Sequence, residues 1–465
     1  MNPKALQTLS EEGKFQEVID KFTRMEIQGT LAALSPDDQI KCVFYQCFSL
    51  SLLNRAEEAL ELSTTMRKKL TSPNEKSLLL ALLSQQLMAL YMLGRLDKGL
   101  ELSTEGDAIM KDLMANERQT GAFWIAVFEH GKGDIYRNKG ELDRALDNYQ
   151  RALAKFEALD NSYWVVLILN DLGRTYSYKG QVDTALEYFK RVETGFEALG
   201  HPWGIARYLN HIGDIYHIKG ELDKALEYYQ RSLKFYEEVG SDIETATSIF
   251  NLLLLTLDKQ DQIQAQAYQL RLQQLHSHTS NQWVHLYSRL ADALILKQSP
   301  RMVDKAQAQI ILKNIVNDEN IRFDLTALAM IHLCELFILE VKVSDDPNLW
   351  EEAKNQIQQL YIQAQDQRLF TIIIEALILK ARLATIEGEL QQTLEYYDKA
   401  RETAEEKHLH LLIQKLNAEK TKFEAEIEKW QTLIQRNTSL QERLKHGQLE
   451  EYLREVQKRL KLMKD

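Results

Sequence analysis

The sequence predicts an all-α protein in which helical hairpins stack into a repeat solenoid. One phrase recurs: "GDIYRNKGELDRALDNYQR" begins at residue 133, "GDIYHIKGELDKALEYYQR" at residue 213, and a looser copy, "GRTYSYKGQVDTALEYFKR", at residue 173. A fixed spacing of 40 residues between such copies is typical of structural units that stack on one another. In addition, only 6 prolines and 19 glycines stand among 465 residues, so few positions interrupt a helix.

Each copy of the phrase predicts two antiparallel helices and the turn between them. A glycine opens the phrase, an aromatic residue follows three positions later, and a second glycine stands seven positions after the first. These positions are Gly133, Gly173 and Gly213, then Tyr136, Tyr176 and Tyr216, then Gly140, Gly180 and Gly220. The first glycine lets a neighbouring helix approach closely, and the second supplies a left-handed cap. We expect the aspartate of "KGELD" to begin the second helix as its N-cap.

A small residue and a large one then mark the second helix of each hairpin. The small positions are Ala145, Ala185 and Ala225, and the large ones are Tyr149, Phe189 and Tyr229. We place the alanines where the two helices cross. Trp124, Trp164 and Trp203 stand nine or ten residues before the repeat glycines, and this periodicity indicates packing residues.

The same register continues outward with weaker matches. Downstream, Ala265 keeps the crossing position while Gln260 replaces the turn glycine. Gly13, Asn54 and Gly94 stand at turns upstream, Gly388 and Thr393 repeat the phrase far downstream, and Ala306 and Ala353 keep the alanine between about 280 and 365. We therefore expect about ten hairpins. The predicted domains are divergent hairpins at 1–120, a regular array at 121–280, divergent hairpins at 281–407 and a C-terminal segment at 408–465.

Apolar residues keep a heptad in the C-terminal segment. The first line is Leu409, Leu416, Phe423 and Trp430, and the second is Ile413, Ile427 and Ile434. This pattern predicts a coiled-coil seam on one long helix over 409–434. After a turn at "KHGQ", "LEEYLREVQKRLKLMK" predicts a second amphipathic helix. These helices either cap the exposed end of the solenoid or pair with a partner, including a second copy in a homodimer.

Composition and motifs argue against several functions. The net charge of −11 gives no basic surface for nucleic acid. We find no phosphate-binding loop, nucleophile elbow or zinc-protease helix in the sequence. The pairs His276/His278 and His408/His410 are two residues apart, which on a helix points them to different sides, so we expect no metal site and no cofactor. Three cysteines without a CxxC motif, no signal peptide and no apolar span favour a cytoplasmic protein.

The order glycine, aromatic, glycine, alanine, aromatic resembles the tetratricopeptide repeat (TPR), most strongly over 121–240. The 40-residue period is similar to the longer repeats of kinesin light chains and of scaffolds that regulate heterotrimeric G proteins. The resemblance implies that the first helix of each hairpin lines a concave groove for peptides or helices. It departs from chaperone-binding TPR proteins, because Asp134 and Asp171 would repel a carboxylate at the positions that clamp one.

Offsets from the repeat glycine carry the groove positions over to this chain. The candidate partner-binding residues are His130, Asp134, Arg137, Asn138, Asn170, Asp171, Arg174, Tyr178, Arg207, Asn210, His211, Asp214 and His217. Asn170 and Asn210 are the sharpest candidates, since an amide both donates to and accepts from a peptide backbone. The alternative is that either asparagine caps a neighbouring loop. We expect groove residues to face solvent in the free protein.

The sequence therefore predicts a non-enzymatic interaction scaffold or adaptor that binds a peptide or helical segment of a protein partner. The alternative is a TPR sensor whose conformation is switched by a short signalling peptide. The two differ in ligand size, because a sensor should tighten around a short peptide while a scaffold should need a folded partner. Nothing in the sequence names that partner.

Overall fold

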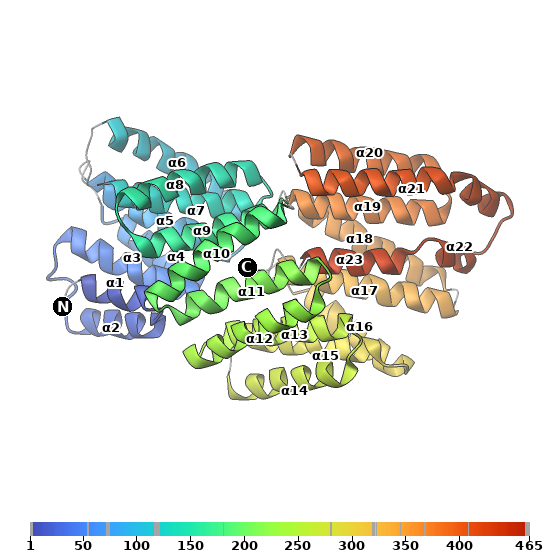
Figure 1. The fold of residues 1–465 in the computed structure, drawn as a ribbon, viewed down its shortest axis with the longest axis horizontal. Coiled ribbons are helices and arrows are strands. Elements are labelled where there is room, and N and C mark those ends of the chain that lie inside the picture. Colours follow the sequence, from blue (N-terminus) through green and yellow to red (C-terminus); the bar gives the residue numbers. More distant parts are fainter. Residues whose placement is uncertain are drawn as a thin grey trace. The chain divides into compact units, whose positions relative to one another are not determined.

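The computed structural model describes residues 3–53, 55–70, 75–115, 121–179, 181–279, 281–318, 321, 323–344, 346–366, 369–407 and 409–460. These residues form twenty-three α-helices and no strand (Figure 1). The all-α prediction is confirmed. Gly180, Asn54 and His408, which the sequence places at two turns and in one histidine pair, lie outside the described residues.

The first twenty helices pair in chain order into ten hairpins, which confirms the predicted repeat solenoid. The first five hairpins are α1 (Pro3–Glu11) with α2 (Phe15–Ile27), α3 (Pro36–Leu52) with α4 (Ala56–Arg67), α5 (Lys76–Met92) with α6 (Leu96–Ala115), α7 (Ala122–Asn138) with α8 (Leu142–Ala158), and α9 (Ser162–Tyr178) with α10 (Val182–Leu199). The next five are α11 (Pro202–Ile218) with α12 (Leu222–Val239), α13 (Asp242–Asp258) with α14 (Gln262–His278), α15 (Gln282–Gln298) with α16 (Met302–Val316), α17 (Phe323–Ser344) with α18 (Pro347–Asp366), and α19 (Phe370–Glu387) with α20 (Leu390–Glu406). Three further helices follow: α21 (His410–Gln435), α22 (Leu440–His446) and α23 (Leu449–Leu460).

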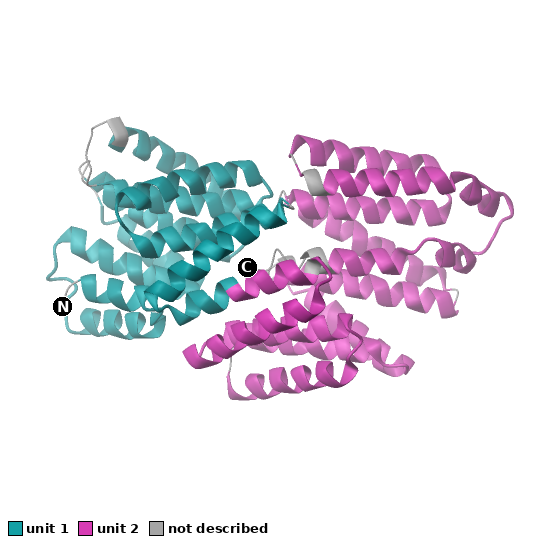
Figure 2. Ribbon diagram, in the orientation of Figure 1, with its two compact units in different colours: residues 1–208 teal, residues 209–465 magenta. Residues whose placement is uncertain are grey.

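The chain gathers into two compact units, residues 1–208 and 209–465, which Figure 2 shows in different colours. Within each unit consecutive helices pack on one another, and first helices of neighbouring hairpins also meet, as α5 meets α7 and α13 meets α15. This side-by-side packing gives each unit a face made of first helices. The four-part division expected from the sequence, with boundaries at 120, 280 and 407, stays a prediction.

The repeat glycines make room for the aromatic side chain of the second helix. A Cβ atom at Gly133 would lie 2.4 Å from the Tyr149 ring, and one at Gly213 would lie 2.6 Å from the Tyr229 ring. Such distances are below van der Waals contact, so any side chain here would push the two helices apart. At the crossing position, Ala185 is completely buried. The glycine and the alanine thus set the close spacing of each hairpin.

The turns follow the predicted left-handed geometry, with one correction. Gly140 and Gly220 have φ angles of +76° and +77°, and Gln260 takes the same region at +60°. The aspartate of each turn is not the N-cap, however. The N-cap of α8 is Glu141, which makes no side-chain cap, and Asp143 stands in the first turn. Its carboxylate instead accepts a hydrogen bond from Lys179, a residue of the next hairpin.

The divergent hairpins also correct one crossing position. Ala306 is exposed, whereas Ala308, two residues later on α16, is fully buried. The crossing alanine of this hairpin is therefore Ala308, and the spacing from the regular array slips by two residues. Ala353 and Thr393 are fully buried, as the sequence predicts.

The C-terminal helices return to the last hairpins. The first heptad line is covered within the chain, since Leu416 and Trp430 are 2% and 3% exposed, and α21 packs on α20 and α19. The second line is half-buried: Ile413, Ile427 and Ile434. The helix α23 packs on α17 and α19. These contacts are those of a cap on the solenoid, and the coiled-coil seam stays a prediction.

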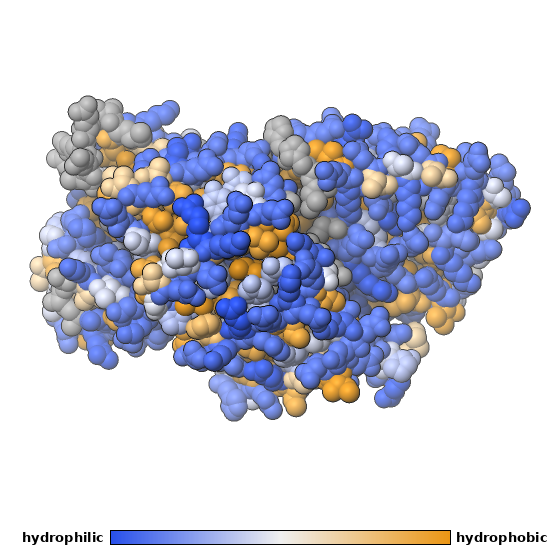
Figure 3. Space-filling model, viewed as in Figure 1, coloured by the Kyte–Doolittle hydropathy of each residue, from blue (hydrophilic) through white to orange (hydrophobic). Residues whose placement is uncertain are grey.

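Polar residues dominate the face of the molecule in Figure 3, with hydrophobic residues in scattered groups. Scattered exposed apolar residues are normal for a folded protein. No helix in the described part of the chain combines the length and apolar character that crossing a lipid bilayer requires. All three cysteines, Cys42, Cys47 and Cys334, are buried free thiols.

Candidate functional site

The candidate residues lie on the first helices α7, α9 and α11, but they do not face solvent as expected. Nine of them are buried: Asp134, Arg137, Asn170, Asp171, Arg174, Asn210, His211, Asp214 and His217. Four are half-buried: His130, Asn138, Tyr178 and Arg207. The expectation of exposure was wrong because these side chains are long enough to pair across neighbouring first helices. We describe the two units in turn.

In the first unit, Asp171 is the centre of an ion network. Its carboxylate accepts a hydrogen bond of 2.9 Å from Arg137 and lies 2.8 Å from Nε2 of His130, both on α7. Two further guanidinium groups stand at longer range, Arg174 at 3.7 Å and Arg207 at 3.9 Å. Asp171 thus connects α7, α9 and α11 through charge.

Asp134 anchors the other side of the same network. Its carboxylate lies 3.0 Å from Arg137 and accepts a 2.7 Å hydrogen bond from the hydroxyl of Tyr149. Tyr149 is the aromatic residue that the repeat glycine admits, so the hairpin packing and the polar network share a side chain. The amide of Asn138 donates to the backbone carbonyl of Asp134, which keeps it within its own helix.

Burial and charge set the protonation of this network. Burial would raise the pKa of Asp171, but Arg137 and His130 hold it well below its usual range. Burial lowers the pKa of His130, yet the carboxylates of Asp134 and Asp171 more than offset this and raise it overall. Three arginines and two aspartates belong to the network, namely Arg137, Arg174, Arg207, Asp134 and Asp171. Its formal charge is +1 before His130 is counted, in a chain whose net charge is −11.

His130, Asp134 and Asp171 also have ligand atoms within 4.8 Å of one another, which is metal-site spacing. The guanidinium of Arg137 contacts both carboxylates, however. A cation already fills the position between them and would repel a metal ion. We therefore interpret the group as an ion network.

An aromatic cluster lies beside the network in the first unit. The ring of His130 is 5.8 Å from that of Trp164, and Phe48 of α3 is 5.7 Å from the same tryptophan. Phe15 of α2 lies 5.4 Å from Trp203. The tryptophans pack in the interior, as their periodicity predicts. The cluster limits the access of water to the ion pairs, which strengthens them.

In the second unit the same positions carry amides and acids that accept hydrogen bonds from other helices. Asp214 accepts a 2.6 Å hydrogen bond from Tyr229, repeating the Asp134 arrangement. His217 lies 2.7 Å from Asp258 of α13. His217 stands where Arg137 stands in its repeat.

Asparagines form a series along the first helices. Asn251 of α13, 41 residues after Asn210, donates a 3.2 Å hydrogen bond to the amide oxygen of Asn210. The side-chain oxygens of Asn170 and Asn251 are buried and have no hydrogen-bond partner among the described residues. A buried acceptor without a donor costs free energy, which a ligand N–H recovers on binding. Asn210 thus contacts a neighbouring first helix, and the loop-cap alternative stays a prediction.

Sequence reasoning missed Asn251 and Asp258. Both belong to α13, where Leu253 replaces the repeat glycine and weakens the match. The 41-residue spacing from Asn210 to Asn251 and from His217 to Asp258 was the available signal. The 40-residue register, counted from Leu253 or from Gln260, points instead to Phe250 and Leu257, one position short of each.

Comparisons with known proteins agree with this geometry. The family model described as "Tetratricopeptide repeat" matches residues 124–198 and 204–275. No curated protein matches the chain in sequence. The apo form of the quorum sensor NprR from B. thuringiensis is 14% identical with a TM-score of 0.52, and the match covers 75% of this chain and 98% of that one. The apo form of RapI is 16% identical with a TM-score of 0.50, covering 79% of this chain and 98% of that one.

At these identities the two solved structures show that the fold is shared. The family match covers the hairpins that hold the ion network and the asparagines. The likeness of the 40-residue period to kinesin light chains stays a prediction. Repeat glycines under aromatic rings, buried crossing alanines, ten consecutive hairpins and the family match lead to one conclusion: residues 124–198 and 204–275 are tetratricopeptide repeats within a solenoid of helical hairpins.

Proposed function

We propose that the first-helix face of the regular array binds an extended peptide or helical segment of a protein partner, and that the chain is a non-enzymatic scaffold or adaptor. The observation that carries this proposal is made in each unit separately: the buried amide oxygen of Asn170 in the first unit and that of Asn251 in the second have no hydrogen-bond partner among the described residues. Each stands on a first helix, where an amide can accept from a ligand's backbone N–H whatever the ligand's side chains are. A purely structural face would be expected to satisfy these atoms within the chain.

A switched sensor is the second candidate. Because the ion network around Asp171 is buried, a ligand that enters this face has to rearrange it, and such a rearrangement couples binding to shape. The NprR structure with a similar fold is described as a quorum sensor. A short peptide that binds alone and changes hydrogen exchange across α7 and α9 would favour the sensor. A requirement for a large partner would favour the scaffold.

The further parts of the proposal concern compartment and partners. Three buried free thiols are consistent with a cytoplasmic protein, and the acidic charge argues against nucleic acid as a partner. Association into a homodimer through 409–434 stays a prediction. Since the first heptad line is covered within the chain, a dimer would have to use Ile413, Ile427 and Ile434. Sedimentation of the full chain and of Ile427→Glu would detect it.

The binding test uses a partner isolated from the native host and measured by calorimetric titration. Asn170→Ala combined with Asn251→Ala should weaken binding roughly 5- to 150-fold, from about 0.5–1.5 kcal/mol per lost hydrogen bond. Asn148→Ala is the matched control, because this asparagine is buried on the second helix α8 and donates within it to the carbonyl of Arg144. Unchanged affinity in the double variant would show that the partner binds elsewhere.

A further inference from the structure

The last helix of the described chain, α23, is amphipathic and covered along one side. Leu449, Tyr452, Leu453 and Val456 are at most 2% exposed, and they follow the i, i+3, i+4, i+7 spacing of one helix face. Glu451 is on the exposed side. This is the pattern with which a separate helix lies in a hydrophobic groove of another protein.

On α19, α23 contacts the positions that the repeat register assigns to the groove. Gly388 is the turn glycine of this hairpin, so Ala381, seven residues earlier, takes the place of the repeat glycine. By the same offsets, Glu375 corresponds to Arg207 and Arg382 to Arg174. The hydroxyl of Tyr452 donates a 2.7 Å hydrogen bond to Glu375, and the guanidinium of Arg382 lies 4.3 Å from the tyrosine ring centre.

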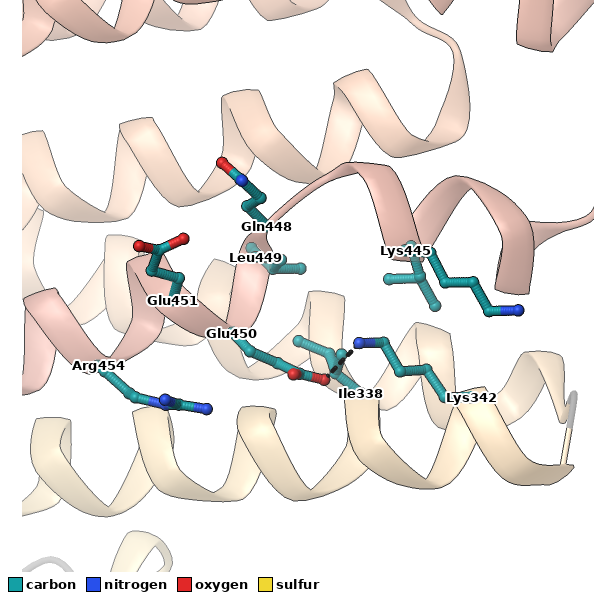
Figure 4. A pocket seen from close by; sticks show the side chains of 9 residues that line it. Ile338, Lys342, Lys445, Gln448, Leu449, Glu450, Glu451 and Arg454 are labelled. Atoms are coloured by element: carbon teal, nitrogen blue, oxygen red, sulfur yellow. Dashed lines mark ion pairs between the residues drawn. The ribbon is translucent and has the colours of Figure 1, made fainter. Parts of the chain in front are cut away.

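On α17, α23 is held by two polar contacts at opposite ends. Near its start, Glu450 forms a 2.7 Å ion pair with Lys342, which Figure 4 shows as a dashed line. Near its end, the amide of Gln457 donates a 3.0 Å hydrogen bond to Glu335. Glu335 also accepts a 2.7 Å hydrogen bond from Lys297 of α15, so the face under α23 is charged as well as apolar.

A helix that only filled a core would meet apolar side chains, whereas α23 meets a face with buried acids and bases. Such a face selects a helix whose polar side chains pair with its buried acids and bases, because buried charges without partners are costly. Beside the start of α23 a pocket of about 200 Å³ remains open, and Ile338, Lys342, Leu449 and Arg454 are among its lining residues (Figure 4). The face therefore accommodates a helix and is covered by α23. Only the short helix α22 connects α23 to the long helix α21.

We propose that the first-helix face of α17 and α19 is a second binding site, separate from that of the regular array, for an amphipathic helix of a partner protein. In this proposal α23 is the built-in occupant. The partner helix carries the same apolar stripe, a tyrosine for Glu375 and an acid in its first turn for Lys342. Because a short tether gives α23 an effective concentration on the order of mM, the partner binds appreciably only when it outcompetes α23 or when α23 is released.

The test uses the full chain and a fluorescent peptide of residues 449–464 as the probe. Leu453→Asp places a charge on the buried side of α23, which should release it and raise peptide affinity at least about tenfold over the wild type, as loss of a tethered competitor predicts. Hydrogen exchange reports whether α23 has lost protection, and circular dichroism reports whether the rest of the chain is folded. Tyr452→Phe is a milder second variant that removes only the hydroxyl bond to Glu375 and should raise affinity less.

A charge exchange tests the geometry. In the Leu453→Asp chain, adding Lys342→Glu should lower the affinity for the wild-type peptide. A peptide that carries Glu450→Lys should bind this double variant with restored affinity. Glu451→Lys is the control peptide, since Glu451 lies on the exposed side of α23. Equal peptide affinity for the wild type and a folded Leu453→Asp chain whose α23 has lost protection would overturn the proposal. So would failure of Glu450→Lys to restore binding to the Lys342→Glu chain.

Discussion

The regular hairpins α7 to α14 and the last hairpins α17 to α20 use the same face of first helices in different ways. In the regular array the buried charges pair with one another, as Asp171 does with Arg137, and two amide oxygens are left without partners. In the last hairpins the acids Glu335 and Glu375 accept hydrogen bonds from α23. On the first face the charges pair among the first helices, and on the other face the acids also accept from the chain's own last helix.

This difference teaches that first helices without the repeat phrase still carry buried charged side chains. The last hairpins lack the repeat glycine, yet Glu375 and Arg382 of α19 contact Tyr452 of α23. Degenerate repeats at the end of a solenoid often cover its last apolar face. Here the covering helix binds as a ligand would, which makes the end of the array a binding surface as well as a cap.

The largest expected effect is that of Asp171→Ala on the stability of the first unit. Removing one member of a buried ion pair typically costs about 3–5 kcal/mol, because its partner stays buried and charged. The Arg137 side chain is 1% exposed and has no route to water in the folded unit. Urea denaturation followed by circular dichroism measures the loss in the free energy of unfolding.

Glu375→Ala is the matched variant in the last hairpins and should cost less. Its partner Lys415 is 16% exposed and can turn to water, and Tyr452 is neutral. Asp147→Ala, an exposed acid on α8, should change stability by no more than about 0.5 kcal/mol. If Glu375→Ala proved as costly as Asp171→Ala, the contrast between a self-paired face and a face paired with α23 would be wrong.

Next in size is the effect of a large residue at the crossing position. Ala185→Trp should cost about 1–3 kcal/mol, the usual range for overpacking a buried site, because Ala185 is fully buried between α9 and α10. Ala306→Trp should be nearly neutral, since Ala306 is exposed and Ala308 takes the crossing position. The denaturation midpoints of both variants check this. A costly Ala306→Trp would restore the register that the sequence suggested.

The sequence predicts the fold best at residues whose size or backbone conformation is fixed by helix packing. Local geometry requires a small or flexible residue at Gly133 beside the Tyr149 ring, at the buried crossing residue Ala185 and at the left-handed turn residue Gly140. Their pattern therefore predicts the hairpins well. The register failed at Ala306, where two nearby alanines are equally suited to a helix and only the neighbouring helix decides between them. The N-cap prediction at Asp143 failed because α8 begins at Leu142, which places Asp143 inside its first turn.

The helices that carry the candidate residues were predictable from the sequence, but the burial of these residues was not. Offsets from the repeat glycine placed Asn170, Asp171 and Arg137 on first helices, and they lie there. Their burial depends on pairing between residues 34 to 41 positions apart, which no local pattern encodes. The partner of α23 could not be foreseen either, since Glu375 and Tyr452 are 77 residues apart.

The smallest predicted effect concerns pH and compares two histidines of the first unit. The pKa of His130 is raised, because the carboxylates of Asp134 and Asp171 outweigh burial. Burial lowers the pKa of His201 to about 4. A raised pKa means that the folded state holds the proton more tightly, so His130 stabilises the fold fully below about pH 6.5 and less as pH rises through its folded pKa. The contribution of His201 to stability depends on pH in the opposite direction. It is fully present above about pH 6.5 and is lost as the pH falls towards the folded pKa of His201.

His130→Gln separates the two contributions, since His201 is present in both chains and cancels in the difference. We expect the variant to lose stability relative to the wild type at pH 6 and to lose less at pH 9, with an effect smaller than that of Asp171→Ala. Denaturation between pH 5 and 9 keeps Asp171 ionised throughout, because its pKa lies well below the usual range. The Asp171→Ala chain supplies the second arm, because without that carboxylate His130→Gln should show a weaker pH dependence. A difference that grew towards alkaline pH would mean that His130 is neutral in the folded unit, and the ion network would then depend on Arg137 alone.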